Sequence, residues 1–195
     1  MLSAVMRRRP ASILGCALAT TALAGALGAC GDEEPSGVAG TSLVAAEAVE
    51  GEPLELNSLG YNVGITRFLN PDDTEDKGYL VGLPAAETGT AYLGVFLRIE
   101  NHTDIERPSA HQYLIFDTLG DEYEALEEIE SPYALEIGAV VPAEGELPGP
   151  NTTAQTGPIN GALLVFLVDD TVNENRPLKL DVASYAGSGE IILDI

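Results

Sequence analysis

Two short acidic stretches contain the side chains best suited to holding a metal ion. In NPDDTEDKG, Asp72, Thr74 and Asp76 stand at alternate positions, the spacing of the first half of a calcium-binding loop. Lys77 and Leu83 occupy the places where an EF-hand needs its glycine and its bidentate glutamate, so that pattern is incomplete. A second oxygen-rich stretch, VDDTVNEN, follows later in the chain. The candidate calcium ligands are Asp72, Asp76, Asp169, Asp170 and Glu174. The alternative is that both stretches are solvated acidic loops.

Other chemistry has little support. A structural zinc site needs four cysteine or histidine ligands, whereas the chain after Cys30 offers only His102 and His111, which we interpret as surface histidines. No G-x-S-x-G motif is present, and Ser109-Ala110-His111 is a local sequence rather than a triad. Acidic pairs are so numerous that none of them indicates glycoside cleavage. We therefore expect a protein without catalytic residues and without a cofactor.

The first 29 residues have the pattern of an export signal. Arg7, Arg8 and Arg9 form a cationic start, and the segment 11–29 is apolar without a charge. About 19 apolar residues approach the length that spans a bilayer, so an uncleaved membrane anchor is one alternative and plain secretion is another. The arginines do not settle the export route. In every case the positive charges stay inside and the rest of the chain is exported.

Cys30 follows directly on this segment. The residues Leu27, Gly28, Ala29 and Cys30 resemble the lipobox of bacterial lipoproteins. That resemblance implies cleavage before Cys30 and lipidation of its thiol, with Leu27, Gly28 and Ala29 as the recognition residues. Cys16, in ILGC, is a poorer candidate because a short apolar run precedes it and the large Leu14 stands where a small residue is preferred. We expect attachment to the cell membrane on its extracytoplasmic side, since two or more acyl chains give stable anchoring.

The net charge limits the partners that the protein could bind. The chain has 31 acidic and nine basic residues, three of which are Arg7–Arg9, and its formal net charge is −22. Binding to nucleic acid depends on Lys and Arg, and is therefore excluded. The acidity is equally consistent with a saline habitat, because a strongly charged surface keeps a protein soluble.

The rest of the chain divides into a linker and one domain. Residues 30–51 are acidic and contain small residues, Pro and Gly, which predicts a flexible tether; a short helix over Ser42–Val49 is the alternative. From 52 to 195 the pattern is that of short strands. Tyr61, Val63 and Ile65 are expected on one face of a strand.

Four further segments complete the predicted β pattern. Leu93, Val95, Leu97 and Ile99 should lie on one face of a second strand, opposite Tyr92 and Phe96. Residues 113–118 and 122–126 should form a hairpin through Gly120-Asp121. Residues 162–168 form a continuous apolar strand, and residues 178–195 a last hairpin with its loop at 186–189. Ser131-Pro132 argues against a helix over 124–136. The fold class is an all-β, immunoglobulin-like antiparallel sandwich.

Four stretches carry a second resemblance. YLGVFLRIENHTD, YLIFDTLGDEYEAL, GALLVFLV and RPLKLDV resemble elements of the telokin-like immunoglobulin-fold domain of unknown function found in bacterial lipoproteins. The resemblance implies the fold and an envelope location, and it carries over no catalytic residue. The sequence as a whole predicts a lipid-anchored, non-enzymatic binding or accessory module of the cell envelope. Its partner is an unidentified envelope protein or extracellular ligand, and the alternative is a module stabilised by Ca²⁺.

Overall fold

Strands make up most of the structure, because short β-forming segments alternate with turns that contain Gly, Pro or Asn. The computed structural model of the chain describes residues 46–195. The strands are β1 (Ala46–Val49), β2 (Pro53–Leu56), β3 (Leu59–Leu69), β4 (Thr90–Asn101), β5 (Arg107–Pro108), β6 (Gln112–Phe116), β7 (Glu122–Glu124), β8 (Val140–Val141), β9 (Glu146–Leu147), β10 (Ala162–Asp169), β11 (Leu178–Ser184) and β12 (Gly187–Leu193). The short helices are η1 (Asp76–Gly78), α1 (Thr153–Thr156) and η2 (Val172–Glu174).

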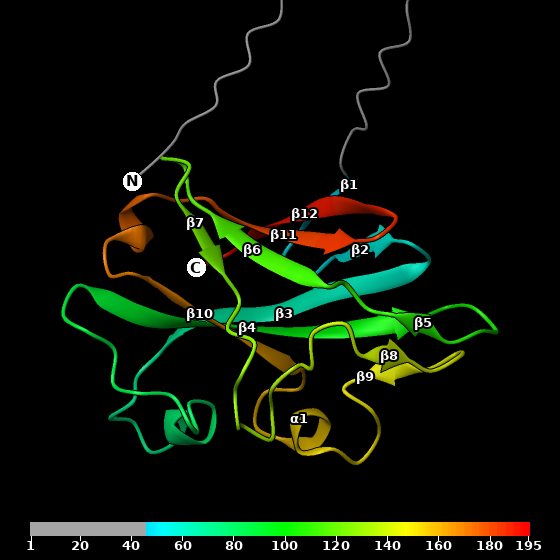
Figure 1. The fold of residues 1–195 in the computed structure, drawn as a ribbon, viewed down its shortest axis with the longest axis horizontal. Helices are drawn as coiled ribbons and strands as arrows, with labels where there is room; N and C mark the ends of the chain where they lie inside the picture. Colours follow the sequence, from blue (N-terminus) through cyan, green and yellow to red (C-terminus); the bar gives the residue numbers. More distant parts are fainter. Residues whose placement is uncertain (1–45) are drawn as a thin grey trace, which may run out of the picture. The chain divides into compact units, whose positions relative to one another are not determined.

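Ten of the twelve strands form two packed sheets, and β5 and β8 pair separately as a two-stranded sheet. Sheet 1 has the order β1-β12-β11-β6-β7, and sheet 2 has the order β10-β4-β3-β2, with β9 added beside β4. Figure 1 shows β6, β11 and β12 in one layer and β3, β4 and β10 in the other, with α1, β8 and β9 beside the second layer. The pairs are antiparallel except β1 with β12. The fold is therefore an all-β, two-sheet sandwich, as its sequence pattern predicts.

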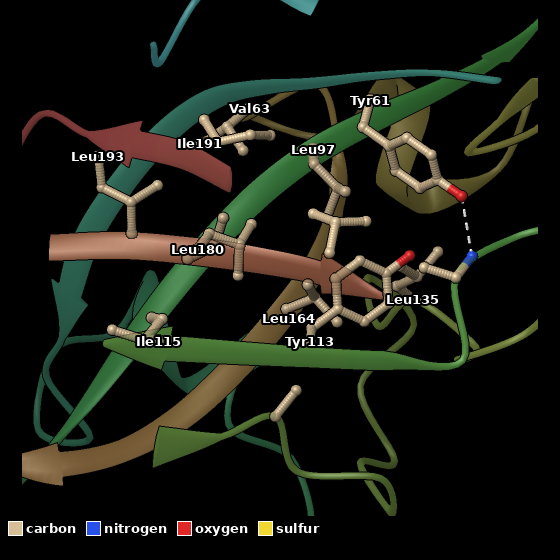
Figure 2. Close-up of a cluster of buried hydrophobic side chains, with 14 of the residues drawn as sticks. Tyr61, Val63, Leu97, Tyr113, Ile115, Leu135, Leu164, Leu180, Ile191 and Leu193 are labelled. Atoms are coloured by element: carbon tan, nitrogen blue, oxygen red, sulfur yellow. Dashed lines mark hydrogen bonds between the residues drawn. The ribbon is translucent and has the colours of Figure 1, made fainter. Parts of the chain in front are cut away.

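Strand β4 shows how the sequence builds the core. Its alternate residues Leu93, Val95, Leu97 and Ile99 are completely buried between the sheets, which confirms the predicted face. They pack with the inward side chains of sheet 1, which include Leu180 of β11 (Figure 2). Burial of each aliphatic side chain of this size contributes about 1.5–3 kcal/mol to folding.

The opposite face of β4 is buried as well. Tyr92 and Phe96 belong to a second apolar cluster that is covered by the connection 70–89. Within it the Tyr79 ring lies edge-on to Phe96, with centroids 5.0 Å apart, and edge-on to Tyr133 at 4.8 Å. The Tyr92 hydroxyl donates a hydrogen bond of 3.0 Å to the carbonyl of Pro84. This second layer explains why β4 and β10 are apolar on both faces.

Strand β3 departs from the predicted alternation at a β-bulge. Tyr61 and Val63 lie in the core, but the register with β4 shifts between Val63 and Ile65. The extra residue at the bulge moves the following side chains to the other face. Ile65 is consequently 41% exposed, and Thr66 is buried instead. The prediction that Ile65 shares the face of Tyr61 was wrong for this reason.

The predicted tether 30–51 extends too far toward the C-terminus. Residues Ala46–Val49 form β1, which pairs in parallel with β12, from Ala46 opposite Gly189 to Val49 opposite Ile192. The alternative of a helix ending at Val49 is wrong for the same residues. A Cβ atom at Gly189 would lie 2.9 Å from the carbonyl oxygen of Ala46 and 2.9 Å from Leu54, so a glycine is needed where β1 approaches.

Glu50, directly after β1, links the two sheets. One carboxylate oxygen accepts a hydrogen bond of 3.0 Å from the backbone N–H of Thr66 in sheet 2. The other accepts one of 3.0 Å from the backbone N–H of Asp194, just after β12. The turn between β1 and β2 is therefore attached to both sheets through the side chain of Glu50.

Both predicted hairpins are present in the structure, and the second has a shorter turn than predicted. Strands β6 and β7 pair through the turn that contains Gly120, whose φ is +90°, as predicted. Strands β11 and β12 also pair, but their turn is Tyr185-Ala186, since Ser184 lies opposite Gly187. The predicted loop 186–189 was therefore too long, and Gly187 begins β12. Residues 125–136 form no helix.

Candidate functional site

The residues predicted for lipid attachment cannot be located in the structure. Leu27, Gly28, Ala29 and Cys30 lie outside residues 46–195, the part of the chain that the structure describes. The cleavage and lipidation of Cys30 therefore stay predictions.

Asp72 and Asp76 are placed differently from a pair of calcium ligands. Asp76 is 2% exposed, and its carboxylate forms an ion pair with the guanidinium of Arg67. Its second oxygen accepts a hydrogen bond of 2.8 Å from the backbone N–H of Asn70. Asp72 is exposed, and its own N–H bonds to the side chain of Asn70. Asp76 is thus already paired with a counter-charge, the partly exposed Arg67, and organises the 70–89 connection.

The second acidic stretch lies at the same end of sheet 2. Asp169 ends β10 opposite Thr90, and Asp170 and Glu174 follow on the exposed turn that contains η2. Over residues 46–195 the structure brings no three His, Cys, Asp or Glu side chains into a group that could hold a metal ion. The two stretches therefore lie near the same end of sheet 2 but do not form a shared set of metal ligands.

The histidines lie on the surface, as expected. His102 is exposed, and its Nε2 lies 3.9 Å from a carboxylate oxygen of Glu55. His111 is exposed at the start of β6, where its ring stacks on Tyr185 with centroids 4.4 Å apart and an interplanar angle of 12°. This stacked pair brings together two residues that are 74 positions apart in the sequence.

The stacked pair forms one wall of a cleft of about 380 Å³ at the end of sheet 1. Its lining residues are His111, Glu127, Glu136, Ile137, Gly138 and Tyr185, which we call the His111–Tyr185 cleft. The residues come from the start of β6, the β11–β12 turn and two parts of the connection after β7. An exposed aromatic face beside carboxylates is suited to recognition of a cation.

Hydrogen bonds fix the backbone beside this cleft. The N–H of His111 donates to the carbonyl of Ala183 at 3.0 Å, and the N–H of Gly138 donates to the carbonyl of Ala110 at 3.0 Å. The N–H of Ala110 donates to the hydroxyl of Tyr61 at 2.9 Å. Figure 2 shows this last bond reaching from β3 in sheet 2 to the loop before β6. The cleft is therefore built on a rigid segment tied to both sheets.

Two buried tyrosines below the cleft differ in how their hydroxyls are satisfied. Burial raises the pKa of Tyr61 to about 12, although the hydrogen bond from Ala110 lowers it. Burial also raises the pKa of Tyr113 well above its ordinary value. The Tyr113 hydroxyl lies beside Ser109, but neither hydroxyl forms a hydrogen bond of normal geometry. Both tyrosines are neutral at physiological pH.

This difference predicts that removal of the two hydroxyls will affect the stability of the protein differently. Tyr61→Phe leaves the buried N–H of Ala110 without a partner, and we expect a loss of about 1–3 kcal/mol in the free energy of unfolding. Tyr113→Phe removes a buried hydroxyl with no partner, so stability should be unchanged or higher. Urea denaturation followed by circular dichroism measures both, and equal losses would contradict the assignment.

A second cleft, of about 460 Å³, lies where β4 ends and includes Glu100, His102, Glu144 and Glu146. Two of its carboxylates are already paired, because Arg98 lies 2.5 Å from Glu146 and 3.1 Å from Glu100. The hydrogen bond to Glu146 raises the pKa of Arg98 above its ordinary value. Its acidic groups are therefore less available to a ligand than those of the His111–Tyr185 cleft.

No helix within residues 46–195 is long and apolar enough to cross a membrane.

The described residues define an all-β, two-sheet sandwich protein with a cleft at one end of sheet 1. No family model matches the chain, and no curated protein matches it. Among solved structures it is similar to MPT63, a secreted protein from Mycobacterium tuberculosis, at 13% identity over 79% of this chain and 100% of the other, with a TM-score of 0.47. It is also similar to an uncharacterized β-sandwich protein from Clostridium difficile, at 14% identity over 76% and 93%, with a TM-score of 0.46. A third is the YjhA protein of Bacillus subtilis, at 10% identity over 75% and 99%, with a TM-score of 0.46.

From the sequence, His111 was interpreted only as a surface histidine, and its partner in the cleft was missed. Tyr185 was assigned no role, and Glu127 and Glu136 were two acids among many. The predicted loop 186–189 left Tyr185 in the preceding strand, so its place in the hairpin turn, where Gly, Asn and Asp are the usual occupants, was not anticipated. Nothing in the sequence indicated which residues it would meet.

Proposed function

We propose that the chain is a lipid-anchored, extracytoplasmic binding module of the cell envelope that acts without catalytic chemistry. The observation that carries the proposal is the sequence Leu27-Gly28-Ala29-Cys30 after a cationic start and an apolar segment. The resemblance of the later strands to the telokin-like domain of bacterial lipoproteins supports the same location. The His111–Tyr185 cleft supports a binding role, since its exposed side chains are aromatic and acidic.

Mass spectrometry of the N-terminal peptide from the membrane fraction tests the anchor. We expect a mature chain that begins at Cys30 and carries acyl groups, because stable attachment needs two or more chains. Cys30→Ala should move the protein out of the membrane fraction or leave the precursor uncleaved. Cys16→Ala is the matched control, because it removes the other cysteine within the apolar segment and should leave processing unchanged.

The two alternatives give different products. An unmodified chain that retains residues 1–29 in the membrane would establish an uncleaved anchor, and an unmodified chain released from the cell would establish plain secretion. Either result would overturn lipidation at Cys30.

A further inference from the structure

The side chain of Tyr185 is exposed on the surface, where it is not needed for the packing of the fold. It is 86% exposed, and the other six tyrosines of the chain, all within the described residues, are buried or half-buried. Its place in the β11–β12 turn is fixed, because the Ser184 hydroxyl donates to the carbonyl of Gly187 and accepts from the N–H of Ala186. One ring face is covered by His111 and the rest of the side chain is open.

The surroundings of this aromatic residue are acidic and come from a different part of the chain. Glu127 and Glu136 line the same cleft and both are exposed. A cation in the cleft would meet the negative face of an aromatic ring and two carboxylates together, and each of these interactions favours positive charge. The chain as a whole has a formal net charge of −22 and would also attract it.

We propose that the His111–Tyr185 cleft binds the guanidinium group of an arginine side chain presented by a partner protein. The inference rests on the proposed binding function and names the chemistry of its ligand. A guanidinium stacks flat on an aromatic ring while its N–H groups pair with carboxylates in the same plane. A lysine ammonium is more strongly hydrated and cannot make both contacts in this way.

The cleft is prepared for such a ligand before it arrives. His111, Gly138 and Ala110 are held by backbone hydrogen bonds to neighbouring segments, and Ala110 is also bonded to the buried Tyr61. Binding would therefore leave this backbone in place, and the entropic cost would come from ordering side chains such as the exposed Glu127 and Glu136.

Fluorine NMR on the full chain, purified from membranes in detergent, tests the proposal. With 3-fluorotyrosine in place of tyrosine, the Tyr185 resonance is identified by its loss in Tyr185→Leu. We expect acetyl-Gly-Arg-Gly-amide to shift this resonance in a saturable way. The same peptide with citrulline, which has the same shape without the charge, should give no saturable shift.

Variants separate the specific site from general attraction to an acidic protein. Tyr185→Leu should weaken binding of the arginine peptide about three- to fivefold, the effect of one exposed cation–π contact. Because this variant lacks the Tyr185 resonance, its binding is measured from the NMR shifts of the backbone amides of residues 137–139. Glu127→Gln and Glu136→Gln should each weaken it by about threefold. Glu128→Gln, the matched control, removes an adjacent exposed charge that does not line the cleft, and should change affinity less than about twofold.

Three outcomes would overturn the proposal: no saturable shift with the arginine peptide, equal binding of acetyl-Gly-Lys-Gly-amide, in which lysine replaces the arginine, or an equal effect of Glu128→Gln and Glu127→Gln. None of them bears on lipidation, which the mass of the N-terminal peptide reports separately. Failure of the ligand assignment is thus distinguishable from failure of the anchored location.

Discussion

Asn101→Ala should lower the free energy of unfolding by about 3 kcal/mol. Asn101 is 3% exposed at the end of β4, and its Nδ2 donates to the carbonyls of Ile105 at 2.8 Å and Pro142 at 2.9 Å, with a longer contact of 3.3 Å to that of Val141. Its Oδ1 accepts from the N–H and the hydroxyl of Thr103. Alanine would leave several of these backbone groups without partners, at about 1–3 kcal/mol for each that stays buried.

The control for this change is Asn62→Ala. Asn62 lies on β3 and makes one long contact of 3.4 Å to the carbonyl of Gly51. Its loss should cost less than about 0.5 kcal/mol. Asn101→Asp should be at least as harmful as alanine at neutral pH, because a carboxylate would face two carbonyl oxygens that the amide now donates to. Urea denaturation of the four proteins compares them, and an Asn101→Ala midpoint equal to that of the wild type would refute the role assigned to this side chain.

Arg67→Met should lower the free energy of unfolding by about 3 kcal/mol. Its partner Asp76 is buried, and removal of the arginine leaves that carboxylate without a counter-charge. Breaking a buried pair by removing one partner costs about 3–5 kcal/mol. The side chain of Arg67 is 38% exposed, so water can reach part of the site and the lower end of that range applies. The 70–89 connection should lose its order first, since Asp76 also bonds to Asn70.

A double-mutant cycle isolates this interaction. Asp76→Asn keeps an acceptor for the N–H of Asn70 but has no charge, so Arg67→Met with Asp76→Asn should recover part of the loss. Lys179→Met provides the surface comparison, because Lys179 and Glu190 form an ion pair of 2.7 Å with both side chains more than one-third exposed. That change should cost less than about 1 kcal/mol. Strictly additive effects of the Arg67 and Asp76 changes would show that the pair contributes nothing to stability.

The strands that the sequence predicts best are those whose periodicity is uninterrupted. In β4 the alternation has no break, and all four of the residues Leu93, Val95, Leu97 and Ile99 face the core as expected. In β3 the same rule fails after Val63, because one extra residue at a bulge reverses the face. A lone glycine within a strand pattern can mark such a bulge, and Gly64 stands at this one. Strand β1 was missed for another reason: its sequence, AEAV, suits a helix or a linker, and pairing with β12 determines its conformation.

The candidate site was less predictable than the fold. The metal-ligand pattern at Asp72 and Asp76 was inferred from local spacing. In the structure Asp76 instead forms an ion pair with Arg67, a residue nine positions earlier on β3. The His111–Tyr185 cleft combines a strand start, a hairpin turn and a connection without regular structure. Loops of this kind are positioned by tertiary contacts, so residues that are far apart in the sequence meet there without a periodic pattern.

The hydrogen bonds of Glu50 determine where a protease can cut the chain without damage to the domain. Its carboxylate bonds both to Thr66 in sheet 2 and to the backbone just after β12, and β1 immediately precedes it. A protease that cut anywhere before Ala46 would leave these bonds and all twelve strands of the described domain in place. A cut between β1 and β2 would detach an edge strand and expose the backbone of β12 to pairing with other chains. The boundary between cuts that leave the sandwich intact and cuts that damage it therefore lies at β1.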